Sequence, residues 1–205
     1  MNALNMIKRT FDILVSILVL AMLLVPMLVI AILIRLGSPG KAIFAQRRAG
    51  RNGKPFTILK FRTMRDDADP YGSSPHSGED PRLTRLGKFL REKSLDELPQ
   101  VFNVIMGQMS LVGPRPLYER QAELWDETQR RRLEVLPGIT GYAQAYGRGQ
   151  LTIEEKIEMD VHYVDNQSFW FDLRIIMRTA INILRPRGEV YEKQYSSDKE
   201  YENDQ

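Results

Sequence analysis

Two adjacent carboxylates, Asp96 and Glu97, are the residues of this chain whose types and spacing most directly suggest chemistry. They lie in the segment Ser94–Pro99, which reads Ser-Leu-Asp-Glu-Leu-Pro. Because proline is tolerated only in the first turn of a helix, the segment predicts a helix that begins with Asp96 as its N-cap. Both carboxylates would then feel the positive end of the helix dipole, which keeps them ionised. Acidic residues are also common at helix starts that have no function.

Several cations have the spacing expected of an anion-binding site. Arg115 stands between two prolines in Gly113–Pro116, a stiff loop that presents a guanidinium with little entropy left to lose. A guanidinium fork matches two phosphate oxygens at once. Lys60 and Arg62 lie on one face of a predicted strand. A turn with an exposed arginine and a solvated strand face explain the same patterns without a ligand.

A second glycine-rich region, Pro137–Gly141 followed by Arg148 between two glycines, could bring backbone amides close to an anion. An ordinary connecting loop has the same composition. Two acids among fixed cations suggest a divalent metal and phosphoryl chemistry, since Mg²⁺ binds through one or two carboxylates plus substrate phosphates. An aspartate can also attack phosphorus to give an acyl phosphate. The chain has no cysteine, which excludes disulfides and thiolate metal sites.

The elements that position these residues indicate an α+β fold that is mostly helical. Ala42–Gln46 and Phe56–Thr63 are rich in strand-forming residues and predict a β-hairpin, and Asp66–Pro81 is a long polar loop. A capping box at Thr152–Glu155 opens one helix. Apolar periodicity and caps predict helices at residues 83–90, 96–109, 117–134, 152–166 and 169–184. The last of these is basic, aromatic and amphipathic, and is expected either in the membrane interface or against the core.

The segment Ile13–Ile34 contains only two residues that are not apolar, Ser16 and Pro26. As a helix it would be roughly 33 Å long, enough to cross the hydrocarbon core of a membrane. Pro26 predicts a kink or a break just beyond the middle. Basic residues stand at both ends of the segment, whereas a crossing helix usually has them on one side. We therefore expect a re-entrant helix with both ends on the cytoplasmic side. These basic residues are Lys8, Arg9, Arg35, Lys41, Arg47 and Arg48.

Charge and length divide the chain into three parts. Residues 1–36 form the expected membrane anchor, 37–185 a cytosolic catalytic domain, and 186–205 a polar tail expected to be disordered. The net charge is only +3, but residues 35–65 contain nine Lys and Arg and no acid. Such a basic region beside an anchor suits anionic lipids or phosphorylated ligands. No helix-turn-helix, RNP or zinc pattern points to nucleic acid.

Four motifs in this order resemble the bacterial sugar transferases, the monotopic phosphoglycosyl transferases that start glycan assembly on polyprenyl phosphate. They are Lys60–Met64 (Lys-Phe-Arg-Thr-Met), Ser94–Gln100, Gly113–Pro116 and Pro137–Gly141. The resemblance runs from the anchor to about residue 185 and looks like the minimal catalytic unit. It implies a re-entrant membrane helix, interfacial amphipathic helices and a catalytic domain on the cytoplasmic face of the inner membrane.

The resemblance also implies a UDP-sugar donor, a polyprenyl phosphate acceptor and Mg²⁺, with a polyprenyl-diphospho-sugar and UMP as products. Asp96 resembles the nucleophile that takes the phospho-sugar covalently, and Glu97 resembles the Mg²⁺ ligand beside it. Phosphate or donor contacts are implied for Lys60, Arg91, Arg115 and Arg148, and Asp160 and Asp172 match further acidic positions. We also expect Arg62 and Asp160 among the residues that contact substrate phosphate.

The chain departs from the family pattern at two places. The family breaks its anchor at a Ser-Pro pair, and here Val25 precedes Pro26. The family often has an asparagine where this chain has Gly149, which bears on sugar recognition. Two other functions fit the same residues: a different lipid-phosphate enzyme such as a phosphatase, and a basic scaffold on the membrane surface.

Overall fold

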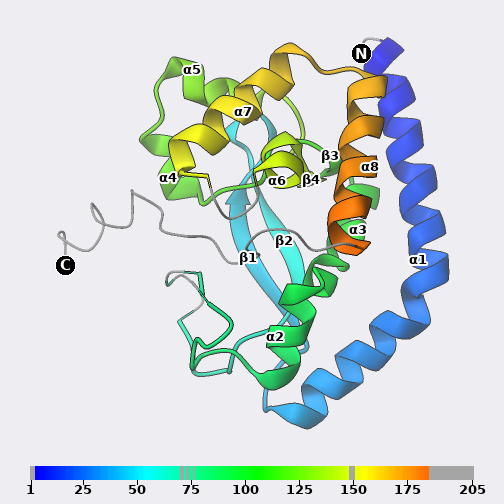
Figure 1. Cartoon of the computed structure of the whole chain (residues 1–205), viewed down its shortest axis with the longest axis vertical. Helices are drawn as coiled ribbons and strands as arrows, with labels where there is room; N and C mark the ends of the chain where they lie inside the picture. The colour runs from blue at the N-terminus through cyan, green and yellow to red at the C-terminus, as the bar shows by residue number, and fades with distance from the viewer. Residues whose placement is uncertain (1–2, 70–71, 73, 76, 148–150, 185–205) are drawn as a thin grey trace.

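The structure is a computed structural model that describes residues 3–69, 72, 74, 75, 77–147 and 151–184. Its first element, α1 (Ala3–Gly37), is a single continuous helix of 35 residues with Pro26 inside it. Residues 6–37 are long and apolar enough to cross a membrane, by length and composition alone. Of the kink or break predicted at Pro26, the structure has a bend and no break, since the backbone stays helical and the helix axis bends part-way along (Figure 1). Proline removes a single amide donor, and the turns on either side keep theirs.

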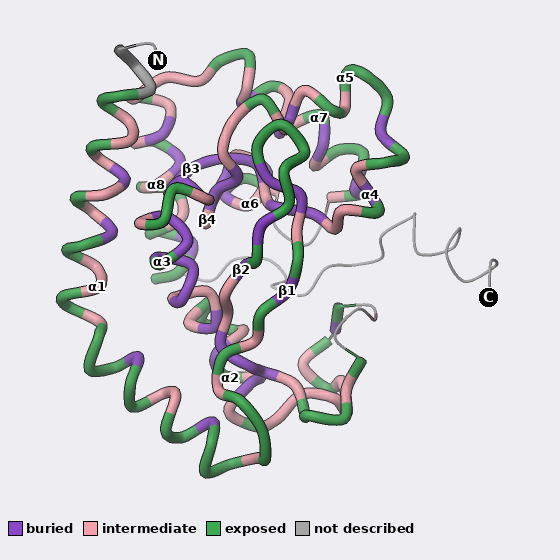
Figure 2. Tube along the Cα trace, turned by 180° about the vertical axis from the view of Figure 1, so that it is seen from behind, coloured by how far each residue is buried: buried purple, intermediate pink, exposed green. Residues whose placement is uncertain are grey.

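One face of α1 is exposed along most of its length, as the green colouring in Figure 2 shows. Its most exposed apolar residues are Leu14, Leu18, Met22, Val25 and Leu36, at 59–79%. The opposite face contacts the rest of the protein. Met27 and Ile34 pack with Phe61 and Leu90 in one hydrophobic cluster. An apolar helix with one bare face and one packed face fits attachment to a membrane.

The predicted hairpin is confirmed. Strands β1 (Ile43–Ala49) and β2 (Pro55–Phe61) pair antiparallel through the centre of the molecule. The turn between them, Arg51–Gly53, places Asn52 in the left-handed region at φ 56°. Figure 1 shows α2 (Arg85–Glu92) below the hairpin, and α3 (Gln100–Ile105) between the hairpin and α1. Val104 and Met109 pack on Phe56 and Ile58 of β2.

Two predicted helices are broken into shorter pieces. The helix expected at 96–109 is a 3-10 turn, η2 (Leu95–Glu97), followed by the six-residue α3. The helix expected at 117–134 is α4 (Glu119–Glu123), α5 (Glu127–Arg130) and the 3-10 turn η3 (Arg131–Leu133). Asp126 caps α5 and so starts a new helix in the middle of the expected one.

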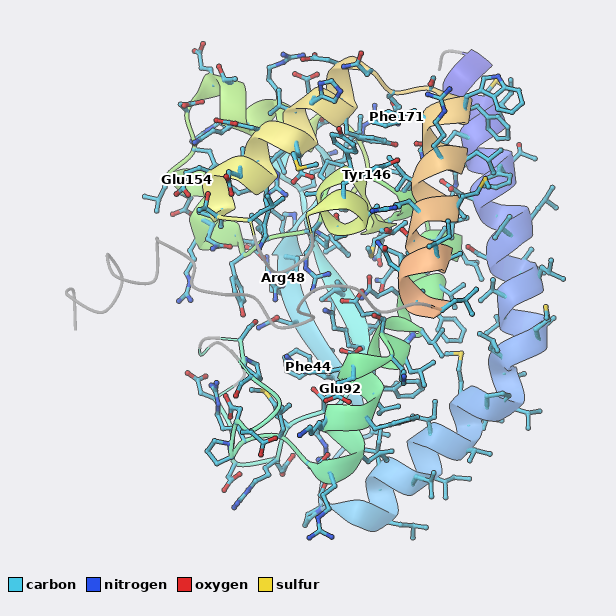
Figure 3. The ribbon with its side chains drawn as sticks, viewed as in Figure 1. Phe44, Arg48, Glu92, Tyr146, Glu154 and Phe171 are labelled. Carbon is cyan, nitrogen blue, oxygen red and sulfur yellow. The ribbon has the colours of Figure 1, made fainter. Side chains whose placement is uncertain are left out.

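The C-terminal part of the described chain is helical, as expected. α7 (Ile153–Asp165) begins at the Thr152 capping box, and α8 spans Phe169–Leu184. Figure 3 shows Tyr146 of the short α6 (Tyr142–Tyr146) and Phe171 of α8 in the region where α6, α7 and α8 meet. Tyr142 packs on Tyr146 and on Phe171, at ring distances of 5.0 and 5.2 Å. The α+β, mostly helical fold class is confirmed, and the tail at 186–205 lies outside the described residues.

A pair of three-residue strands was not predicted. β3 (Ser110–Val112) and β4 (Gly138–Thr140) pair in parallel. Each strand adjoins one of the glycine-proline motifs. The pair therefore brings the Arg115 loop and the Pro137–Gly141 segment side by side.

Candidate active site

Asp96 and Glu97 lie in the η2 turn, between α2 and α3. The chain enters this turn through Ser94, whose φ of 56° is in the left-handed region that residues other than glycine rarely adopt. A strained backbone of this kind persists only where surrounding contacts enforce it, and such positions cluster at functional sites. The turn directs both carboxylates inward, leaving Asp96 8% exposed.

Two cations pin the Glu97 carboxylate. Lys60 Nζ from β2 lies 2.7 Å from Glu97 Oε1, and Arg115 Nη1 lies 3.1 Å from the same oxygen. Burial acts to raise the pKa of Glu97, but Lys60 and Arg115 together outweigh it and hold that pKa well below its usual range. Glu97 is therefore ionised at neutral pH. Burial in turn lowers the pKa of Lys60, against the pull of Glu97.

The pKa of Asp96 is shifted in the opposite direction. Its carboxylate accepts no hydrogen bond from the residues that the structure describes. Burial, together with the neighbouring charge of Glu97, raises the pKa of Asp96 to about 6, although Lys60, Arg91 and Arg115 act to lower it. The pair thus joins one carboxylate fixed by ion pairs with one that titrates near neutrality, and this separation is typical of paired catalytic acids.

Arg91 reaches the site from α2. Its Nε donates to Thr63 Oγ1 at 2.8 Å. This contact depends on Gly87, where a Cβ would lie 1.9 Å from the carbonyl oxygen of Thr63, so α2 approaches the chain as closely as only glycine permits. Thr63 and Gly87 were not singled out from the sequence, although Thr63 belongs to the Lys60–Met64 motif.

The loop that carries Arg115 is held by the parallel strand pair. The Gly113 amide donates to the Thr140 carbonyl, and the Gly138 amide donates to the Pro114 carbonyl, both at 2.9 Å. A Cβ on Gly138 would lie 2.1 Å from the Gly113 nitrogen, so the two glycine motifs are in direct backbone contact. The glycines of these motifs therefore serve this contact in the structure.

Arg132 binds the backbone of the loop that carries Arg115. Its Nη2 donates to the Arg115 carbonyl at 2.7 Å and to Asp160 Oδ2 at 2.5 Å. The side chains of Arg132 and Asp160 are 2% and 1% exposed. The prediction that Asp160 contacts substrate phosphate is therefore not supported, because a buried carboxylate paired with an arginine can neither reach nor attract a phosphate. Arg132 was missed because nothing in the sequence Arg-Arg-Arg distinguishes it from its neighbours.

Arg62 also differs from its predicted role. It lies one residue beyond β2, 8% exposed, and binds the residues that follow α1. Its Nη2 donates to the Ser38 carbonyl at 2.9 Å, and its Nη1 donates to the Pro39 carbonyl and to Asp66. Its guanidinium thus holds the C-terminal end of α1 against β2. Arg148 lies outside the described residues.

No group of three or more metal-binding side chains occurs in the part of the chain that the structure describes. Asp96 and Glu97 are the adjacent carboxylates at the site, and the two cations that bind Glu97 share Oε1, leaving Oε2 with no hydrogen bond from described residues. A donor set of two carboxylates suits Mg²⁺ when substrate phosphates complete the coordination. The residues therefore fit this ion only in combination with a phosphorylated ligand.

Two carboxylates among three cations, next to a long apolar helix, are the arrangement expected of a protein class that acts on anionic substrates beside an apolar phase. Comparison of the sequence with known protein families identifies the family. The model of the bacterial sugar transferase family matches residues 3–186. The chain therefore belongs to the bacterial sugar transferases, which confirms the resemblance drawn from the four motifs.

Several relatives are similar over most of this chain. The uncharacterized sugar transferase EpsL of Bacillus subtilis is 45% identical over 182 residues, which is 89% of each chain. The exopolysaccharide production protein ExoY of Sinorhizobium fredii is 39% identical over 88% of this chain and 87% of its own. The UDP-glucose:undecaprenyl-phosphate glucose-1-phosphate transferase of Escherichia coli is 40% identical over 86% of this chain, which matches 40% of that larger protein.

Proposed function

We propose that this sugar transferase moves a sugar 1-phosphate from a UDP-sugar to polyprenyl phosphate and releases UMP. The observation that carries the proposal is the Asp96 carboxylate, which accepts no hydrogen bond from described residues and lies among Lys60, Arg91 and Arg115. The names of relatives support the substrates. Those from Escherichia coli and Aeromonas hydrophila, both 40% identical, are named as sugar-phosphate transferases acting on undecaprenyl phosphate with UDP-glucose and UDP-N-acetylgalactosamine.

The chemistry follows from the different states of the two carboxylates. An Asp96 oxygen attacks the β-phosphorus of the UDP-sugar, the bond from that phosphorus to the bridging oxygen breaks, and UMP leaves with the electron pair. A phosphate oxygen of the polyprenyl phosphate then attacks the same phosphorus and displaces Asp96, giving the polyprenyl-diphospho-sugar. Lys60 and Arg115 keep Glu97 ionised and, with Arg91, place fixed positive charge where phosphoryl charge develops. Mg²⁺ held by Glu97 and Asp96 would neutralise diphosphate charge.

We also propose that the domain is monotopic and lies on the cytoplasmic face of the inner membrane. Both ends of α1 are bonded to the same domain: Arg9 donates to the Val104 carbonyl at 2.7 Å, and Arg62 donates to the Ser38 carbonyl at 2.9 Å. One folded domain cannot lie on both sides of a bilayer, so these contacts favour a bent helix whose two ends lie on the same side of the membrane. Since the chain has no cysteine, Met6→Cys and Lys41→Cys can be labelled separately in vesicles. Labelling from opposite sides would contradict the proposal.

The activity is tested with the full chain in nanodiscs containing undecaprenyl phosphate, using a panel of UDP-sugars and measuring UMP. We expect UMP release that requires Mg²⁺, and Asp96→Asn should abolish it. Without acceptor, the wild type should retain label from a UDP-sugar radiolabelled in the sugar, and Asp96→Asn should not. Full turnover by Asp96→Asn would end the covalent proposal. Release of free phosphate instead of UMP would indicate a phosphatase.

A further inference from the structure

The first turns of α1 are docked onto the catalytic domain through a buried polar cluster. Lys8 Nζ lies 2.6 Å from Asp172 Oδ2 and donates to the Val112 carbonyl at 3.0 Å. The Tyr163 hydroxyl donates to Asp172 Oδ1 at 2.7 Å. The Lys8 and Asp172 side chains are only 11% and 6% exposed.

Asp12 and Arg9 extend the contact along the helix. Asp12 is 2% exposed and accepts a hydrogen bond from the Leu111 amide at 3.2 Å. Arg9 donates to the carbonyls of Val104 and Ile105 at the end of α3, at 2.7 and 3.1 Å. The anchor is therefore bonded to β3 and to the last turn of α3. Both are elements of the catalytic domain that are distant from it in the sequence.

β3 and α3 are adjacent in the sequence to residues of the candidate active site. Val112, which Lys8 binds, is followed by Gly113 and then by the loop whose Arg115 contacts Glu97. α3, whose end Arg9 binds, starts three residues after Glu97. A shift of β3 relative to the anchor would consequently move the guanidinium that fixes Glu97.

The burial of Lys8 separates this arrangement from an ordinary membrane flank. A cation that serves only to orient a membrane segment stays in water or among lipid headgroups, as exposed Arg35 does at the other end of α1. Burying a charge is unfavourable unless it is paired and hydrogen-bonded. Lys8 is paired with Asp172 and also bonded to the backbone of β3, which fits a specific docking contact.

We propose that Lys8 and Asp172 are positioning residues: they fasten the membrane helix to β3 and so hold Arg115 against Glu97. The part of this proposal that concerns turnover rests on the proposed function. The docking itself does not, because it concerns the placement of α1 on the domain. The two parts are measured separately.

The test compares Lys8→Met with the matched control Arg35→Met, which removes an exposed cation from the other end of α1. Docking is measured by the distance distribution between spin labels at Thr10→Cys and Glu158→Cys, both exposed positions, in nanodiscs. Turnover is measured as UMP release. Lys8→Met should broaden the distribution and lower kcat on the order of a hundredfold, since small misplacements of catalytic groups have effects of this size. Arg35→Met should leave both unchanged.

Three further variants separate the docking contact from the charge of Lys8. Lys8→Arg keeps the charge but replaces the compact ammonium by a larger, planar guanidinium, so it should lower kcat about tenfold, whereas a charge that only flanks the membrane would tolerate the change fully. Lys8→Met with Asp172→Asn removes the Asp172 charge that Lys8→Met alone leaves unpaired and preserves the acceptor of Tyr163, so it should recover much of the narrow distribution. Asp172→Asn alone replaces Lys8→Met if the latter does not fold, and it should broaden the distribution.

The results that would overturn the docking proposal differ from the result that would overturn the proposed function. A narrow distribution and wild-type kcat in Lys8→Met, or in Asp172→Asn where that variant replaces it, would overturn the proposal. Equal losses in Lys8→Met and Arg35→Met would also overturn it, because the charge alone would then explain the effect. If the wild type released no UMP with any UDP-sugar, the proposed function would fail, and the distance distribution would still decide the docking.

Discussion

Replacing Asp96 with asparagine should stabilise the protein while abolishing its activity. Raising the pKa of Asp96 from 3.8 to about 6 corresponds to about 3 kcal/mol, because a tenfold change in proton affinity is about 1.4 kcal/mol. The folded protein binds the proton more tightly than the unfolded chain does. Ionised Asp96 therefore lowers stability progressively as pH rises from about 4 to 6, and by the full amount above that range. Asparagine has nearly the same shape and cannot ionise, so it avoids this loss.

The expected gain for Asp96→Asn is thus about 3 kcal/mol at pH 8 and only about 1 kcal/mol at pH 4.5. For a chain of this size, about 3 kcal/mol corresponds to a rise in Tm of about 6–12 °C. The assay is thermal unfolding in detergent at pH 4.5 and pH 8, with Glu158→Gln as the control because it removes an acid at an exposed position of α7. An equal shift in Tm at both pH values, or a lower Tm at pH 8, would refute the account of the Asp96 environment.

Three further predictions concern the supporting groups. The kcat/KM for UMP release should fall as the pH drops below about 6, where Asp96 takes up a proton. Lys60→Met should move the midpoint of this fall to higher pH, because Lys60 lowers the pKa of Asp96. An unchanged midpoint in pH–rate profiles would contradict this coupling. Gly87→Ala should lower the free energy of unfolding by at least about 1–3 kcal/mol, since its Cβ would lie 1.9 Å from the Thr63 carbonyl oxygen; wild-type stability in denaturant titrations would show that α2 retreats without cost. Arg132→Met should lower the free energy of unfolding by about 3–5 kcal/mol, because it leaves the buried carboxylate of Asp160 unpaired. Adding Asp160→Asn should recover most of this loss. No recovery in denaturant titrations would mean that the two side chains are not coupled.

Much of the site could be predicted from residue types. Adjacent acids before a proline and an arginine between two prolines are unusual enough to stand out, and the structure brings Asp96, Glu97, Lys60, Arg91 and Arg115 together. The hairpin was also predictable, because β-formers separated by glycine and proline have few alternative structures.

The partners of the remaining residues could not be predicted, because the sequence does not specify the direction of a side chain just beyond a strand or within a helix. Arg62 binds the Ser38 carbonyl, and Asp160 binds Arg132, although both were expected to face substrate. The parallel pair β3–β4 has only three residues per strand, too few for an alternating pattern. Lys8 was interpreted as a membrane flank because its partner, Asp172, lies 164 residues further along the chain.

This last separation has a consequence for how the protein is made. The contact between Lys8 and Asp172 cannot form until the start of α8 has left the ribosome, 164 residues after Lys8. Asp12 and Arg9 can bind β3 and α3 earlier, because those elements are synthesised before α8. A chain truncated before α8 would keep Asp96, Glu97 and these earlier contacts of α1, but Lys8 would lack its carboxylate partner. The docking of α1 is thus completed only when α8 has been synthesised and packs onto it.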